Sequence, residues 1–269
     1  MLRSTKDLRG YTLRATDGEI GNVDDFLFDD EQWTIRYMVA NTGGWLSGRL
    51  VLISPIVLGN VGWEARTLEV ALTRKQIEHS PDIATDQPVS RQHEAELAQY
   101  YGYSPYWGGT GLWGPSLFPY ALGGTLGPPL APPTSITATE RELASRPTKR
   151  DDQHLRSARD VRRYHIHARD GEIGHADDFI VDDETWAIRY MVVDTRNWWP
   201  GKHVLVAPQW ISAIDWDTFS VWDTFSVTVD LLRETIKQGP EYDPAILNRE
   251  YETALYRHYR RPGYWETPR

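Results

Sequence analysis

The sequence has no cysteine among its 269 residues. This absence excludes disulfides, thiolate nucleophiles, and thiolate ligands for zinc or iron–sulfur clusters. No apolar run approaches the roughly eighteen residues that a membrane-spanning helix needs, and the first residues lack the apolar core of a signal peptide. We therefore expect a cytoplasmic protein that does not insert into a membrane.

The sequence also has no excess of basic over acidic residues. The chain has 29 Lys and Arg against 38 Asp and Glu, which gives a formal net charge of −9. A surface with this balance repels phosphate backbones, so direct binding to nucleic acid is not expected.

Familiar signatures of catalysis and phosphate binding are absent as well. The sequence has no G-x-S-x-G, no G-x-x-x-x-G-K-[ST], no G-x-G-x-x-G and no convincing Ser/His/Asp arrangement. We expect the protein not to be an enzyme and to carry no cofactor.

The sequence does contain an internal repeat. Tyr11–Leu58 aligns with Tyr164–Ile211 without gaps, and 25 of the 48 positions are identical. The similarity continues in two later pairs of segments, Trp63–Ile77 with Trp222–Ile236 and Ser90–Tyr101 with Asn248–Tyr259. Self-similarity on this scale indicates two copies of one structural unit, each ending in a helical arm.

Each copy is predicted to be mostly β-strand, with helices near its end. Asp17-Gly18 and Asp170-Gly171 are tight-turn signals between short apolar segments. A short helix is expected around Arg74–His79, and arm helices should begin at the preferred N-cap residues Ser90 and Asn248.

Alternation along Trp33–Ala40 places Trp33 and the alternate residues after it on the face toward the core. Trp186 should be a core residue in the second copy. Arg36 and its copy Arg189 then point away from the core, where they pair with the acidic turns at an exposed surface.

These motifs resemble a known family. Leu8-x-Gly10-Tyr11, the run from Asp17 to Phe26, and the Trp33-x-Ile35-Arg36-Tyr37 segment are similar to the PRC-barrel domain. That domain occurs in the cytoplasmic part of the photosynthetic reaction centre H subunit, and it resembles the C-terminal domain of the ribosome maturation factor. The resemblance implies a small β-barrel that docks onto proteins or large assemblies, in the manner of two-barrel bacterial proteins, with no family-wide catalytic residues.

The expected fold class is therefore mainly β with peripheral helices, in two homologous PRC-type β-barrels in tandem. We assign a first barrel to residues 1–81 and its helical arm to 82–107, a Gly/Pro/aromatic and charged linker to 108–154, a second barrel to 155–240 and its arm to 241–269. The two barrels are expected to pair pseudo-symmetrically within the chain. Each arm is expected to pack across the other unit.

Two groups of potential metal ligands do not have the pattern of a metal site. The acidic residues between Asp17 and Glu31, with their copies between Asp170 and Glu184, do not have the spacing of a calcium loop, and turn chemistry explains them. The pair His165-x-His167 lacks a third ligand, and His175 and His203 are isolated in the sequence.

The large aromatic residues of two loops point to an interface. Trp45 lies near Arg49 in the first copy, and Trp198 and Trp199 lie near Lys202 in the second. Large aromatic side chains beside a basic residue are typical anchors of protein–protein interfaces. An equally weighted alternative is that they cover the open end of their own barrel or pack on the partner barrel.

The function expected from these patterns is a non-catalytic interaction or scaffold module with an unidentified protein partner. A cation- or ligand-responsive sensor that uses the acidic turns or the cleft between barrels is one alternative. A ribosome- or RNA-processing-associated factor is another. Peripheral association with a membrane would need a partner, and the sequence leaves homo-oligomerisation open.

Overall fold

The computed structural model describes residues 1–81, 89–123, 154–195, 202–216 and 226–266. It divides into two compact units. The unit built around the first repeat, here the N unit, comprises Asp7–Ser157 and Glu184–Ala187. The unit built around the second repeat, here the C unit, comprises Met1–Lys6, Ala158–Asp183 and Ile188–Arg269.

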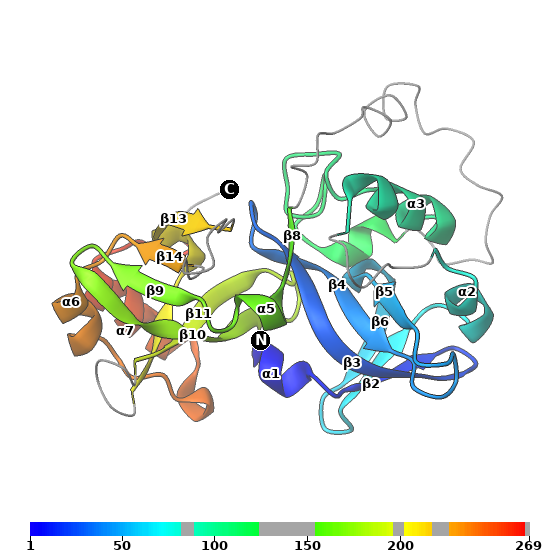
Figure 1. Cartoon of the computed structure of the whole chain (residues 1–269), viewed down its shortest axis with the longest axis horizontal. Helices are drawn as coiled ribbons and strands as arrows, with labels where there is room; N and C mark the ends of the chain where they lie inside the picture. The colour runs from blue at the N-terminus through cyan, green and yellow to red at the C-terminus, as the bar shows by residue number, and fades with distance from the viewer. Residues whose placement is uncertain (82–88, 124–153, 196–201, 217–225, 267–269) are drawn as a thin grey trace, which may run out of the picture. The chain divides into compact units, whose positions relative to one another are not determined.

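The N unit is a seven-stranded sheet with helices from its arm (Figure 1). Its elements are β2 (Thr12–Ala15), β3 (Gly18–Asp29), β4 (Thr34–Asn41), β5 (Leu50–Ile53), η1 (Pro55–Val57), β6 (Leu58–Gly62), β7 (Thr67–Val70), α2 (Arg74–Glu78), α3 (Arg91–Tyr101), η2 (Pro119–Leu122) and β8 (Leu155–Ser157). The strand order is β5-β4-β3-β2-β7-β6, and β8 pairs with β3.

The C unit repeats this plan. Its elements are β1 (Leu2–Ser4), α5 (Ala158–Val161), β9 (His165–Ala168), β10 (Gly171–Asp182), β11 (Ile188–Asp194), β12 (His203–Val206), η3 (Pro208–Trp210), β13 (Ile211–Asp215), β14 (Ser226–Val229), α6 (Arg233–Gln238), η4 (Pro244–Ile246) and α7 (Arg249–Tyr259). The order is β12-β11-β10-β9-β14-β13, with β1 on β10. The mainly β fold class and the two-copy architecture are confirmed.

The compact units differ from the expected boundaries because the repeats exchange a strand. The short helix α1 (Thr5–Leu8) carries the chain from β1 in the C unit into the N unit. The copy of β1, β8, precedes the second repeat in sequence and lies in the sheet of the first. Residues 1–6 were expected in the first barrel and residues 155–157 in the second. The C-terminal parts of β3 and β10, beyond their pairing with β2 and β9, take the other repeat's strand instead.

The predicted helices form where their caps were expected. Ser90 accepts a hydrogen bond from the backbone N–H of His93, and Asn248 accepts one from Tyr251. The α2 helix begins with a capping box between Thr73 and Gln76. Each of these polar side chains satisfies an N–H group that a helix leaves unpaired in its first turn.

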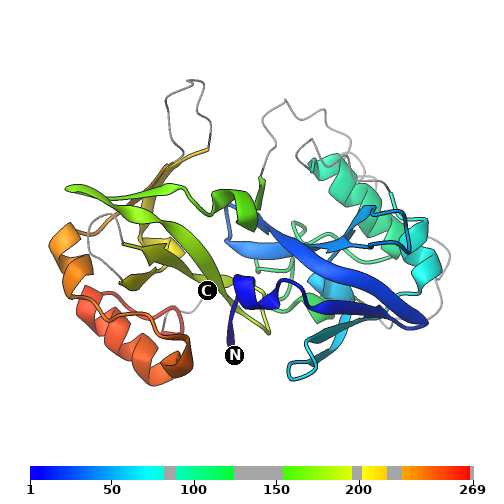
Figure 2. The ribbon, with the colours of Figure 1, turned by 60° about the horizontal axis from the view of Figure 1, so that its bottom comes forward.

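Each arm packs on the sheet of its own unit, not across the other one as expected. In the N unit Leu97 of α3 packs against Tyr37 and Leu52. In the C unit the Trp210 ring lies 4.8 Å from that of Tyr259 and 5.2 Å from that of Tyr256, both on α7. Figure 2 shows α6 (orange) beside α7 (red) on one side of the C-unit sheet. The apolar face of each arm therefore finds its partner locally.

The segment expected to be a linker is partly built into the N unit. Trp113 is fully buried, and its indole N–H donates to the backbone carbonyl of Thr185 at 2.8 Å. Its backbone N–H bonds to the carbonyl of Ser116, and Pro119 begins η2. Residues 124–153 of the expected linker lie outside the described residues. Within the described part of the chain, no helix is long and apolar enough to cross a membrane.

Candidate functional site

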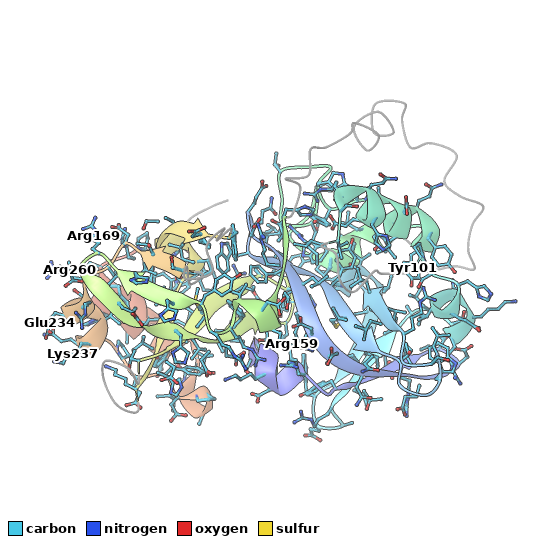
Figure 3. All side chains as sticks on the ribbon, in the orientation of Figure 1. Tyr101, Arg159, Arg169, Glu234, Lys237 and Arg260 are labelled. Carbon is cyan, nitrogen blue, oxygen red and sulfur yellow. The ribbon has the colours of Figure 1, made fainter. Side chains whose placement is uncertain are left out.

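The basic residues of the expected interface loops cap helices. Arg49 donates to the backbone carbonyl of Glu78 at 2.7 Å and to that of Ser80, at the C-terminal end of α2. Lys202 donates to the carbonyls of Lys237 and Gly239, at 2.6 and 2.7 Å, at the end of α6, where Figure 3 labels Lys237. A cation satisfies the carbonyl groups that a helix leaves unpaired at this end.

The loop tryptophans have an intrachain role where the structure describes them. Trp45 is half-buried, and the Arg74 guanidinium lies 4.3 Å from the centre of its ring. Trp198 and Trp199 lie outside the described residues. The position of Trp45 agrees with the alternative that this loop covers its own unit.

In the repeated Ile-Arg-Tyr motif Arg36 is buried and Arg189 is half-buried, so the expectation that they lie at an exposed surface is wrong. The pairing of β3 with β4 shifts register between Leu27 and Phe28, which leaves Arg36 as the extra residue of a β-bulge. A bulge breaks the alternation from which the outward direction was inferred. The pairing of β10 with β11 shifts at the equivalent place, so Arg189 is the extra residue there.

The Arg36 side chain is 0% exposed. It pairs with Asp29 at 3.0 Å, bonds to Gln32 at 3.0 Å, and donates to the carbonyl of Leu112. Its guanidinium also lies 3.8 Å from the ring centre of Tyr106 and 4.8 Å from that of Trp113. The pairing with an acidic turn was predicted; the aromatic cover was not.

A buried glutamate of each arm extends this arrangement. Glu94 of α3 accepts from the hydroxyl of Tyr106 at 2.8 Å and lies 2.6 Å from Nε2 of His154. Its copy Glu252 accepts from the hydroxyls of Tyr190 and Tyr264, at 2.8 and 3.0 Å. Burial raises the pKa of Tyr190 well above its usual range. Glu252 therefore fastens α7 to β11, and Glu94 fastens α3 to Tyr106 and to the residue before β8.

Several of the acidic residues considered as cation ligands are bonded to groups of the chain. Asp17 accepts from the backbone N–H of Arg74 at 2.7 Å at the start of α2, and Asp170 accepts from Arg233 at 2.8 Å at the start of α6. Asp30 pairs with Arg156 at 2.8 Å. Its pKa is raised, because burial outweighs the opposing effect of Arg156.

The histidines of the second repeat are less isolated than the sequence indicated. His175, Asp194 and His203 are opposite one another on the adjacent strands β10, β11 and β12. The Nε2 atoms of the two histidines lie 3.8 and 3.9 Å from one oxygen of buried Asp194. His165 pairs instead with Glu172 at 3.0 Å. No group of three or more His, Asp or Glu side chains among the described residues is arranged to hold a metal ion.

An exposed apolar patch of the N unit was not predicted from the sequence. Leu117 is 47% exposed and Tyr120 is 65% exposed, and the ring of Phe118 stacks on that of Tyr120 with the centres 5.3 Å apart. Buried Pro119 and Leu122 hold the segment against the unit. The run of apolar and aromatic residues in the expected linker was the signal for this patch. Composition alone did not establish that the segment packs on a barrel.

Comparison with known protein families identifies one domain. Residues 3–73 match the family model of the PRC-barrel domain. The match runs from β1 through β7 to the cap of α2, and the C unit repeats the same strand order. The chain thus contains a PRC-barrel domain, followed by a second unit consistent with a tandem pair. No curated protein matches the chain.

Proposed function

We propose that this chain, with its PRC-barrel domain, is a non-catalytic protein-binding module that docks onto a larger protein through the N unit. The docking surface is the exposed apolar patch, here defined as Leu117, Phe118 and Tyr120. Its exposed leucine and stacked aromatic pair are the observation that carries the proposal.

The patch has the properties of an interface anchor. Aromatic side chains contribute much binding energy at low conformational cost, since few rotamers must be fixed. The stacking of Phe118 on Tyr120 restrains both rings before any partner arrives. The partner expected from this chemistry is a protein with an apolar recess and a basic rim, which suits a chain of net charge −9.

The polar groups support binding over the sensor alternative. A cation-responsive site needs carboxylates that converge on one point. Asp17 instead caps a helix, Asp29 pairs with Arg36, and Asp30 pairs with Arg156. A cation would have to displace an arginine or a helix N-terminus from each of them.

The test is co-purification of the tagged full-length chain from its own cells after mild cross-linking. The variant Leu117→Ser/Tyr120→Ser removes the exposed apolar groups and leaves the buried ones in place. Leu232→Ser/Ile246→Ser is the matched control, because these residues are 49% and 52% exposed in the C unit. We expect one stoichiometric partner with the wild type and the control, and its loss with the patch variant. Equal recovery with both variants, or no partner with the wild type, would reject the proposal.

A further inference from the structure

Each sheet is completed by three residues from the other repeat. β1 pairs antiparallel with β10, with Leu2 opposite Asp182 and Ser4 opposite Ile180. β8 pairs antiparallel with β3, with Leu155 opposite Asp29 and Ser157 opposite Leu27. Both exchanged strands read Leu-Arg-Ser. Figure 1 shows β8 against β3 in the N unit.

The two receiving sites use aspartates at equivalent positions of the two repeats. The hydroxyl of Ser157 donates to Asp25 at 2.5 Å, and that of Ser4 donates to the equivalent Asp178. Asp25 and Asp178 directly follow bulges in β3 and β10, where the register shifts after Val23 and Ala176. A bulge redirects the following side chain, which here aims a buried carboxylate at the incoming strand.

The arginine of each strand pairs with a second aspartate. Arg156 lies 2.8 Å from Asp30, and Arg3 lies 3.3 Å from Asp183. The same aspartates also bond through the backbone to the residue before each exchanged strand. The N–H of Asp30 donates to the carbonyl of His154, and the N–H of Asp183 donates to the carbonyl of Met1. Strand addition of this kind gains affinity from the backbone and specificity from the side chains.

Because both sites hold the same tripeptide through the same groups, they recognise the strand's sequence and not its position in the chain. We propose that each site also accepts the Leu-Arg-Ser strand of a second copy of this chain, so that two copies form a reciprocally exchanged dimer. In that dimer the first repeat of one copy receives β8 from the other, and every contact described inside a unit is kept.

Concentration sets the balance between the two forms. Monomer and dimer contain the same contacts. Their free energies therefore differ mainly in entropy, which is lost on joining two chains in the dimer and on closing the chain on itself in the monomer. A tethered strand acts at an effective concentration on the order of millimolar. The monomer therefore dominates in dilute solution, and the dimer grows as the protein approaches millimolar concentration.

Charge reversal separates exchange between copies from exchange within one. The variants are Arg156→Glu and Asp30→Arg, and each alone places like charges at the N-unit site both in its monomer and in its reciprocally exchanged dimer. When the two variants are mixed, the charges at positions 156 and 30 are opposite only if each copy donates its β8 to the other copy. Native mass spectrometry at several hundred micromolar should show a 1:1 dimer of twice the 30.9-kDa chain mass in the mixture. Each variant alone should form at least tenfold less dimer.

The double variant Arg156→Glu/Asp30→Arg is the control, since it restores the pair within one chain and should stay as monomeric as the wild type at equal concentration. If either single variant fails to fold, Arg3→Glu with Asp183→Arg repeats the experiment at the more exposed C-unit site. Folded variants that remain separate monomers when mixed would overturn the proposal.

Discussion

At the scale of single residues, the same side chain type has different surroundings in the two repeats. Arg36 is fully buried and enclosed by Asp29, Tyr106 and Trp113, whereas Arg189 is partly exposed, pairs with Asp182 at 2.9 Å and stacks on Tyr264. A buried charge is tolerated only when it is paired and hydrogen-bonded. Substitution of the enclosed Arg36 should therefore destabilise the fold more than substitution of Arg189.

The prediction is that Arg36→Met lowers the free energy of unfolding by about 3–5 kcal/mol, because it leaves the carboxylate of Asp29 buried without its cation. Arg189→Met should cost clearly less, since its pair is partly exposed. Urea unfolding of both variants measures the difference. Asp29→Asn in the Arg36→Met background should recover part of the loss, and equal effects of Arg36→Met and Arg189→Met would contradict the argument.

At the scale of elements, β3 and β10 are long strands that depend on one glycine each. Gly21 has φ +147°, and a Cβ atom there would lie 2.0 Å from the backbone oxygen of Asn41. Gly174 has φ +137°, and its Cβ would lie 2.0 Å from the oxygen of Asp194. Close approach of the neighbouring strand therefore requires glycine at both positions, which explains the repeated Glu-Ile-Gly.

Gly21→Ala and Gly174→Ala should each destabilise the protein by about 3 kcal/mol or more, because the backbone of the next strand must move to make room. Gly43→Ala is the matched control. Gly43 also has a positive φ, +55°, but nothing lies within 4 Å of the added atom, so only about 1 kcal/mol of backbone strain is expected. Thermal or urea unfolding measures the loss of stability in each variant. Equal losses in all three would show that contact with the next strand does not contribute to the effect.

At the scale of the whole molecule, the repeats are interlocked. The C unit contains β1 from the start of the chain, and the N unit contains β8 together with Glu184–Ala187 from the second repeat. The backbone N–H of Ile35 bonds to the carbonyl of Trp186 at 2.9 Å, which adds a second connection inside the N unit. Neither repeat completes its unit without the other.

Cutting the chain between Gly123 and His154, at an inserted protease site, should therefore leave the two fragments associated. We expect them to elute together in size-exclusion chromatography under native conditions and to separate in denaturant. The same cut in Arg3→Glu/Arg156→Glu, where both exchanged strands meet like charges, should weaken the association. Separation of the wild-type fragments without denaturant would contradict the interlocked arrangement.

Much of the local structure could be predicted from the sequence. The repeat, the turns, the capped helices and the mainly β class follow from spacing and residue type, because these features depend on neighbours a few residues apart. The burial of Trp33 and Trp186 was also predicted, and both are buried, but Trp186 lies in the N unit and not, as expected, in the core of its own copy. The interface prediction for the loops was made from residue type alone, and it did not foresee that Arg49 and Lys202 bond to helix ends.

The sequence by itself determined that the chain folds as two copies of one β-rich plan, since 25 identities in 48 positions preserve the same pattern of apolar residues, turns and caps. Only the tertiary structure decided which repeat receives which Leu-Arg-Ser strand and which side of the sheet holds Arg36. The two strands are identical, so no local preference distinguishes the partners, and the bulge at Arg36 breaks the alternation from which the outward direction of this side chain was inferred.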